Sequence, residues 1–204
     1  WGAPWLEEVP VQPFFVGREA ELARLREWHQ ADRCAVITVL GVGGAGKTSL
    51  VAQYVRSCAA QPAASPVDRV LWASLLNAPP LRSLLRIWLR SLSAQALPDH
   101  TDDVDELLAQ LFAHLRAQRC LLVLDNLESI MQGGGEVGRF RDGYTEYGLL
   151  LQRLVELPHA GTLILTSREL PSVLARDAGR AGSAVRTLQL AGLSAGSGAA
   201  LLAH

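Results

Sequence analysis

The sequence AVITVLGVGGAGKT, at residues 35–48, decides the fold of this chain. Its first six residues form an apolar run, β-branched in the middle, which is typical of a strand buried on both faces of a parallel sheet. A glycine-rich loop follows directly, and residues 47–60 then have the pattern of a helix. We therefore expect a loop that connects a buried strand to a helix.

Residues 41–48 match the phosphate-loop pattern Gly-x-x-x-x-Gly-Lys-Thr, and they lie between a strand and a helix, where that pattern functions. Glycines let the backbone bend so that its N–H groups point at phosphate oxygens, and the helix N-terminus adds positive potential. Lys47 is expected to reach the β- and γ-phosphates, and the Thr48 hydroxyl to bind Mg²⁺.

The rest of the chain alternates strand and helix patterns. Further buried runs predict strands at residues 69–74, 120–124, 162–166 and 185–190, and amphipathic spacing predicts helices at residues 19–28, 81–92 and 104–115. This order predicts an α/β fold of the P-loop NTPase type: a doubly wound, mostly parallel five-stranded sheet flanked by helices in three α/β/α layers. Residues 132–148 carry six glycines and are expected to form a surface loop.

Two further motifs follow strands of this sheet. Residues 121–125 (LLVLD) end in Asp125, which is expected beside the phosphate loop as a direct or water-mediated Mg²⁺ ligand; the alternative is an aspartate that caps the next turn. Glu128 is the nearest acid that can orient or deprotonate water, unless it is simply solvated. Arg168 follows the fourth predicted strand and is a candidate reader of the γ-phosphate, or else a surface residue.

Composition limits the classes of partner. The net charge of -1 gives no overall attraction to nucleic acid or to an anionic membrane, and Arg82, Arg86 and Arg90 are best read as a solvated helix face. No apolar run approaches 18 residues, so we expect no membrane span. Three widely spaced cysteines in apolar surroundings indicate a reduced, cytoplasmic protein. The first residue is Trp1, which suggests that the chain is part of something longer.

Four motifs in order resemble the signal-transducing STAND NTPases, specifically bacterial NB-ARC-like domains. They are residues 15–18 (FVGR), the phosphate loop with its paired glycines, residues 124–128 (LDNLE) and residues 166–169 (TSRE). The resemblance implies that the backbone at Val16 and the side chain of Arg18 approach the adenine and phosphates, and that Arg168 reports the γ-phosphate. Many relatives carry a second acid directly after the Mg²⁺-binding aspartate, where this chain has Asn126.

The resemblance also implies a division of the chain. Residues 1–15 are expected to be an extended lead, residues 16–190 the NB-ARC-like domain, and residues 191–204 the start of a truncated helical domain. The candidate catalytic residues are Lys47, Asp125, Glu128 and Arg168, and the candidate metal ligands are Thr48 and Asp125. The candidate nucleotide-binding residues are Val16, Arg18, Gly43, Gly44, Ala45, Gly46, Lys47, Thr48 and Ser49.

The leading functional hypothesis is an ATP- and ADP-binding regulatory switch with Mg²⁺ and slow hydrolysis. Its expected partners are an adenine nucleotide and further copies of the full-length protein, with sensor and effector domains outside this chain and no direct contact with nucleic acid or membrane. Three alternatives stay open: a scaffold that binds nucleotide without hydrolysis, a P-loop kinase and a DNA-associated ATPase.

Overall fold

Five strands form one parallel sheet in the order β2-β3-β4-β1-β5. The computed structural model describes residues 9–12, 14–61, 67–93, 103–134, 137–180 and 182–192. The strands are β1 (Val36–Leu40), β2 (Arg69–Ser74), β3 (Cys120–Asp125), β4 (Thr162–Ser167) and β5 (Val185–Gln189). The expected doubly wound α/β fold is confirmed, and all four strand pairs are parallel.

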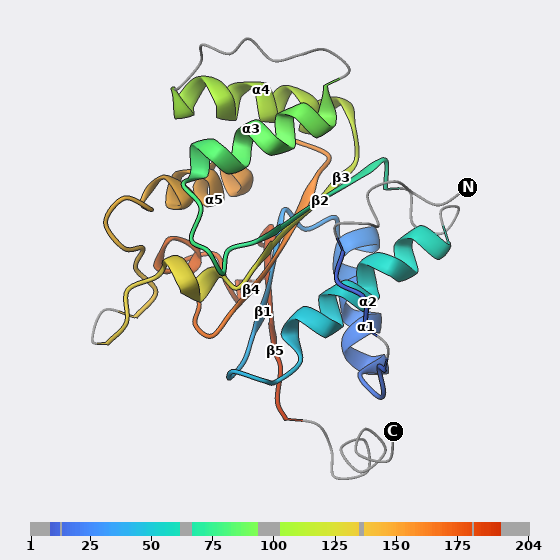
Figure 1. The fold of residues 1–204 in the computed structure, drawn as a ribbon. Coiled ribbons are helices and arrows are strands. Elements are labelled where there is room, and N and C mark those ends of the chain that lie inside the picture. The colour runs from blue at the N-terminus through green and yellow to red at the C-terminus, as the bar shows by residue number, and fades with distance from the viewer. Residues whose placement is uncertain are drawn as a thin grey trace.

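Helices cover both faces of the sheet (Figure 1). On one face lie α1 (Glu19–Arg26), its π-helical continuation η2 (Glu27–Ala31) and α2 (Lys47–Ala60). On the other lie α3 (Leu81–Leu92), α4 (Val104–Ala117) and α5 (Glu146–Glu156). Two short 3₁₀ helices, η3 (Leu127–Ile130) and η4 (Ser172–Leu174), follow β3 and β4.

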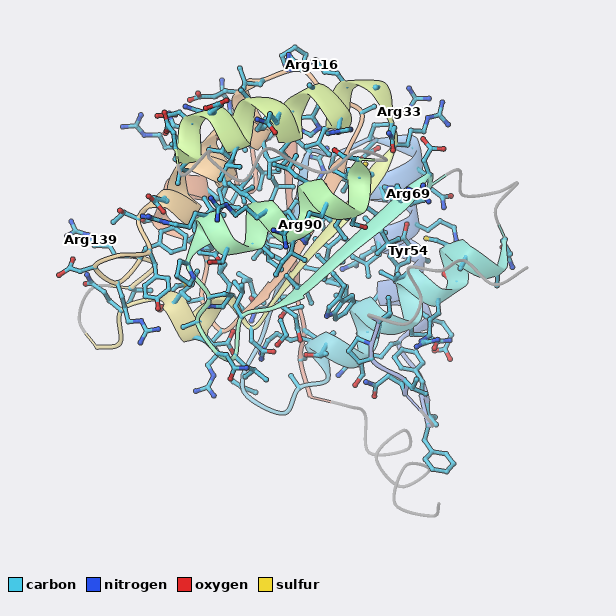
Figure 2. All side chains as sticks on the ribbon, turned by 45° about the horizontal axis from the view of Figure 1, so that its top comes forward. Arg33, Tyr54, Arg69, Arg90, Arg116 and Arg139 are labelled. Atoms are coloured by element: carbon cyan, nitrogen blue, oxygen red, sulfur yellow. The ribbon has the colours of Figure 1, made fainter. Side chains whose placement is uncertain are left out.

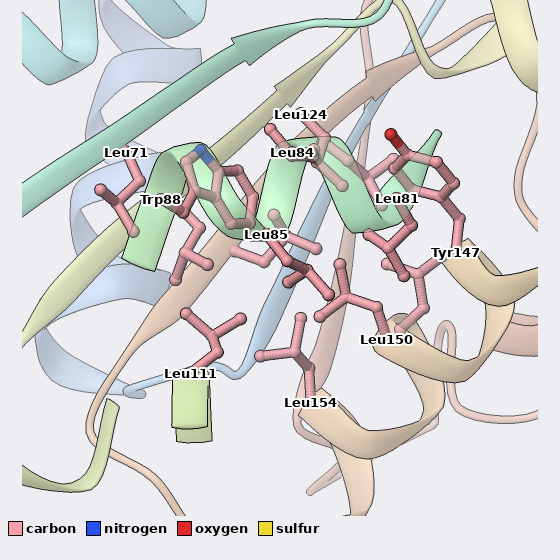
Figure 3. Packing of buried hydrophobic residues seen from close by; sticks show 14 of the residues in the cluster. Leu71, Leu81, Leu84, Leu85, Trp88, Leu111, Leu124, Tyr147, Leu150 and Leu154 are labelled. Atoms are coloured by element: carbon pink, nitrogen blue, oxygen red, sulfur yellow. The ribbon is translucent and has the colours of Figure 1, made fainter. Parts of the chain in front are cut away.

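The strands read as continuous apolar runs because both of their faces are buried. Successive side chains of a strand point to opposite faces. In β3, Leu122 and Leu124 therefore join the core under α3, α4 and α5, whereas Leu121 and Val123 join the core under α1 and α2. Figure 3 shows the first of these cores, where Trp88 and Leu85 of α3 pack with Leu150 and Leu154 of α5.

Helix α5 was not expected from the sequence. The predicted surface loop at residues 132–148 ends at Thr145, and its last three residues, Glu146 to Gly148, belong to the first turn of α5. The helix forms because Tyr147, Leu150, Leu151 and Leu154 recur on one face and are all buried against the sheet. Before the helix, Met131 and Phe140 form an isolated antiparallel bridge.

Several further expectations concern features away from the sheet. The extended lead (residues 1–15) and the start of a helical domain (residues 191–204) fall largely on residues 1–8, 13 and 193–204, which lie outside the described residues. Within the described part, no helix combines the length and apolar character needed to cross a bilayer. All three cysteines are described, and each is buried and outside any disulfide.

The topology positions the chemistry of the chain. Because β1 lies between β4 and β5, and β3 lies beyond β4, the carboxyl ends of these parallel strands meet at one edge of the sheet. Ligands of open α/β sheets bind outside this edge. The residues at the ends of β1, β3 and β4 are Leu40, Asp125 and Ser167.

A buried polar pair joins η2 to α2. The Nδ1 atom of His29 lies 2.6 Å from the Tyr54 hydroxyl, and the two rings meet edge to face. Burial lowers the pKa of His29 from 6.5 to about 4, and burial also raises the pKa of the Tyr54 phenol above its ordinary value. Both groups are therefore neutral at pH 7.

This pair predicts a pH dependence of stability. Because the pKa of His29 is lower in the folded than in the unfolded chain, the unfolded chain binds more protons between about pH 6.5 and pH 4. The His29 contribution is complete above pH 6.5 and decreases by up to about 3 kcal/mol as the pH falls to 4. Urea unfolding at several pH values gives the free energy of unfolding as a function of pH. Between pH 4 and pH 6.5 this free energy should change less steeply with pH for His29→Gln than for the wild type. Equal slopes would contradict the prediction.

Candidate nucleotide-binding site

The phosphate loop begins where β1 meets its two neighbours. The Gly41 N–H donates to the Ser167 carbonyl of β4 at 3.2 Å, and the Leu190 N–H donates to the Leu40 carbonyl at 2.7 Å. A Cβ atom at Gly41 would lie 2.7 Å from the Leu190 carbonyl oxygen, so only glycine fits there. Gly46, which precedes α2, has a φ of 86°, a left-handed conformation that glycine adopts without strain.

Lys47 lies inside the loop rather than in solvent. Its side chain is 6% exposed, and Nζ donates to the Gly41 carbonyl at 2.8 Å and to the Val42 carbonyl at 3.2 Å. A buried ammonium group is tolerated only when it has such partners. The loop therefore holds a positive charge at its centre, surrounded by its own backbone.

A hydroxyl–carboxylate network surrounds Asp125. The Thr48 hydroxyl donates to Asp125, 2.9 Å from Oδ1 and 3.1 Å from Oδ2. The Thr166 hydroxyl donates to Oδ1 at 2.6 Å and accepts from the Asn126 N–H at 2.9 Å. Asp125 is 3% exposed and Thr166 is fully buried. The network fixes the carboxylate at the end of β3 beside the first turn of α2.

Thr166 is a site residue that the sequence indicates only as the first position of the motif TSRE. Residues 162–166 (TLILT) predict a buried strand. A hydroxyl residue at the end of such a strand is the feature of the sequence that could indicate a site residue. The strand order is needed to place Thr166 in the site, because β4 lies between β1 and β3. Thr166 is therefore placed between the phosphate loop and Asp125.

The residues present fit a magnesium ion. Mg²⁺ prefers hard oxygen ligands and binds few protein groups besides phosphates and water. The Thr48 hydroxyl and the Asp125 carboxylate are oxygen donors from different elements, and they lie within hydrogen-bonding distance of each other at the edge of the loop. These two residues would hold the ion.

Glu128 and Arg168 complete the charged cluster. The Oε1 atom of Glu128, in η3, lies 4.0 Å from Lys47 Nζ and 3.5 Å from Arg168 Nε. Its other oxygen, Oε2, is buried and has no hydrogen-bond partner among the described residues. A Cβ atom at Gly43 would lie 3.3 Å from a terminal guanidinium nitrogen of Arg168, so this arginine reaches over the phosphate loop.

The side chain of Arg18 contacts the backbone of the phosphate loop. One terminal nitrogen of its guanidinium donates to the Ala45 carbonyl at 3.2 Å and to the Ala191 carbonyl at 2.7 Å, and the other donates to Glu21 at 2.8 Å. Burial raises the pKa of the Glu21 carboxyl, but the hydrogen bond from Arg18 and the nearby positive charges outweigh it and leave the pKa below its ordinary value. Arg18 thus links the phosphate loop to the segment that leaves β5.

The remaining predicted nucleotide-binding residues lie around this cluster. Val16 is partly buried ahead of α1, and Gly44 has a φ of 77° with open space where a side chain would point. The Ser49 hydroxyl donates to the Gln12 side chain at 3.0 Å. Lys47, Thr48, Asp125, Glu128 and Arg168 are brought together at one edge, whereas Ser49 faces the N-terminal segment.

Comparison with known proteins identifies a family of ATPases. A family model described as "AAA ATPase domain" matches residues 15–165. An uncharacterized WD repeat-containing protein of Nostoc sp. is 38% identical over 196 residues, which cover 95% of this chain and 15% of that protein. The chain therefore spans a small part of its curated relative.

Solved structures share the fold. The ORC1 protein of Aeropyrum pernix, solved in complex with DNA, is 18% identical, with a TM-score of 0.64 over 98% of this chain and 52% of that one. The ORC2 protein of the same organism, solved as ADPNP-ADP complexes, is also 18% identical, with a TM-score of 0.63 over 99% of this chain and 55% of that one. The finer resemblance to NB-ARC-like domains stays a prediction.

The network at Asp125 predicts the effect of removing one hydroxyl. Thr166→Val keeps the shape of the side chain but leaves the partly buried Asn126 N–H without its acceptor, at a cost of about 1–3 kcal/mol in stability. Because Asp125 also loses a donor, Mg²⁺–nucleotide affinity measured by calorimetry should fall about tenfold or more. Thr166→Ser should restore it.

Thr162→Val is the matched control. Its hydroxyl is buried at the opposite end of β4 and donates to the Cys34 carbonyl at 2.8 Å. The control should lose stability with unchanged nucleotide affinity. Equal affinity losses in both variants would show that Thr166 acts only through general stability.

Proposed function

The chain belongs to the AAA ATPase domain family, and on that premise we propose that it is an ATP- and ADP-binding regulatory switch domain with slow, Mg²⁺-dependent hydrolysis. In this proposal it acts in the cytoplasm as one domain of a larger protein. ADP favours a closed state of that protein, and ATP favours an open state that self-associates.

One observation carries the proposal: a single carboxylate, Glu128, is shared between two cations of the site, Lys47 and Arg168. A bound phosphate group would give Lys47 and Arg168 a second anionic partner at the same place. Two partly buried negative charges 4 Å apart repel each other by on the order of 4 kcal/mol. A phosphate and the Glu128 carboxylate therefore compete for the two cations.

The number of phosphates decides how far this competition goes. ADP ends one phosphate earlier than ATP, so ADP leaves the Arg168–Glu128 pair in place, whereas the γ-phosphate of ATP attracts Arg168 and releases Glu128. Arg168 has a side chain that is 66% exposed, and it is free to change partner. A switch requires a difference in contacts between two ligand states, and this exchange supplies it.

The same exchange prepares the site for hydrolysis. Lys47 and the loop N–H groups hold the phosphates, and Thr48 and Asp125 hold Mg²⁺, which when bound neutralises the charge that develops on the phosphate oxygens. Glu128, once released, is the acid that orients the attacking water. Asn126 offers no second carboxylate, so turnover is slow and the occupied state, rather than the product, is the output.

Arg18 gives the nucleotide state a route to the rest of the protein. Its guanidinium joins the Ala45 carbonyl in the phosphate loop to the Ala191 carbonyl after β5. A change in the loop backbone on phosphate binding alters the geometry available to Arg18, and hence the position of the segment that leaves the sheet.

The comparisons are compatible with a domain of a larger protein. The curated relative contains WD repeats, and this chain matches 15% of its length. WD repeats build propellers that contact partners, which suits a sensor part outside this chain. DNA binding is a property of the ORC1 protein and is not carried over to this chain. The net charge of -1 of this chain does not favour DNA binding.

Thermal unfolding tests nucleotide binding first. Saturation with Mg²⁺–ADP or Mg²⁺–ATP at 100 times the dissociation constant should add about 2.7 kcal/mol of stability, a rise in midpoint of roughly 5–10 °C for a domain of this size. GTP should give a smaller rise, and Lys47→Ala should abolish all shifts. No shift with any nucleotide would contradict binding by this chain.

Glu128→Gln tests the proposed exchange. Removing the carboxylate charge should slow hydrolysis about 100-fold or more, and it should strengthen ATP binding because no carboxylate then competes for Lys47 and Arg168. Glu169→Gln, which changes the acid next to Arg168, is the control and should alter neither quantity. Unchanged hydrolysis in Glu128→Gln would exclude Glu128 as the catalytic acid, and undetectable hydrolysis in the wild type would favour the non-hydrolysing scaffold.

A further inference from the structure

A second polar pocket lies at the opposite edge of the sheet from the phosphate loop. It encloses about 230 Å³ and is lined by residues that precede or begin β1, β3 and β4, together with η2. The lining residues are His29, Gln30, Arg33, Arg119, His159, Ala160, Gly161 and Thr162. Nothing in the proposed switch mechanism uses this pocket.

The part of the chain that the structure describes supplies no carboxylate to the guanidinium groups of the two pocket arginines. Within the described residues, neither the Arg33 nor the Arg119 guanidinium has an ion-pair or hydrogen-bond partner. The nearest acids along the chain are already engaged: Asp32 pairs with Arg186 at 3.4 Å, and Asp68 accepts from the Arg119 main-chain N–H at 2.8 Å. In Figure 2, Arg33 and Arg69 lie toward this same end of the sheet.

The histidines add fixed hydrogen-bonding groups. The 2.6 Å hydrogen bond between His29 Nδ1 and the Tyr54 hydroxyl leaves Nε2 as the second ring nitrogen, which carries the hydrogen of the neutral ring when the phenol is the donor. His159 is used structurally, since Nε2 donates to the Leu154 carbonyl and Nδ1 accepts from the Gly161 N–H. The pocket thus offers two guanidinium groups, an imidazole N–H and the Gln30 amide, all of which can donate.

Arg33 also has a strained backbone. Its φ is 50°, in the left-handed region that residues with a side chain rarely adopt. Such strain is retained where the surrounding structure requires it, and it is often found at functional sites. At this position a glycine would remove the strain but would also remove the guanidinium from the pocket.

We propose that this pocket binds a small oxyanion, a phosphate- or carboxylate-bearing molecule held by Arg33 and Arg119 with His29 Nε2–H as a further donor. Arginine binds both classes of anion through paired hydrogen bonds. The enclosed volume suits a compact ligand rather than a nucleotide. The site is separate from the phosphate loop, so it belongs to the chain whether or not the switch function holds.

Titration with two probes tests the site directly. Inorganic pyrophosphate and citrate should each shift the His29 ring signals in NMR spectra in a saturable way, with a dissociation constant of about 1 mM or tighter for the better probe. The better probe identifies the ligand as phosphate- or carboxylate-bearing. The shift should persist in Lys47→Ala, in which the phosphate loop no longer contributes. No saturable shift with either probe would overturn the proposal.

Variants separate binding from stability. Arg33→Gly should weaken probe binding about tenfold, the effect of one charge-assisted hydrogen bond, and it should also raise the unfolding midpoint because the left-handed backbone is relaxed. Arg119→Ala should weaken binding similarly with little change in midpoint. Arg116→Ala, which removes an exposed arginine outside the pocket lining, is the control. Equal weakening by Arg116→Ala would reduce the effect to general surface charge and refute a defined site.

Discussion

The burial of β1 between β4 and β5 fixes where the phosphate loop begins. Every residue of β1 is buried, and the strand is hydrogen-bonded on both sides up to Leu40. The chain must then leave the sheet at Gly41, in a space that the Leu190 carbonyl closes to any side chain. The loop, the first turn of α2 and the position of Lys47 all follow from this exit point. Without the packed sheet, the same glycines would have no defined shape.

Groups of the protein itself occupy the positions around Lys47 and Arg168 where a phosphate would bind. Lys47 is bonded to two carbonyls of its own loop, and Glu128 lies between Lys47 and Arg168. Desolvated charges require partners. An anion that enters the site therefore replaces contacts that Lys47 and Arg168 already make, because neither cation is without a partner. This replacement makes the site sensitive to the number and placement of negative charges, and it lowers the net affinity that a phosphate group gains there.

Most of the fold could be predicted because its strands are short apolar runs that end at polar or glycine residues, and because α3 shows a regular leucine spacing. Helix α5 was not predicted because its first turn is part of the glycine-rich stretch 132–148, and no element was assigned to the apolar face of Leu150 and Leu154 beyond it. Asp125, Glu128 and Arg168 could be placed at one edge, since parallel strands share their carboxyl ends. The role of Thr166 and the contact between Arg18 and Ala191 depend on strand order and on a separation of 173 residues, which local patterns do not encode.

The backbone at Asn126 limits which residue types can follow Asp125, the proposed magnesium ligand. This residue has a φ of 63°, and its N–H is bonded to Thr166. Among residues with side chains, asparagine and aspartate tolerate this conformation best. The two differ by a single atom and by a negative charge next to Asp125. Under the proposed function, the single replacement Asn126→Asp would add a second carboxylate and change the rate of hydrolysis, with the sheet, the loop and the neighbouring hydrogen bonds left as they are.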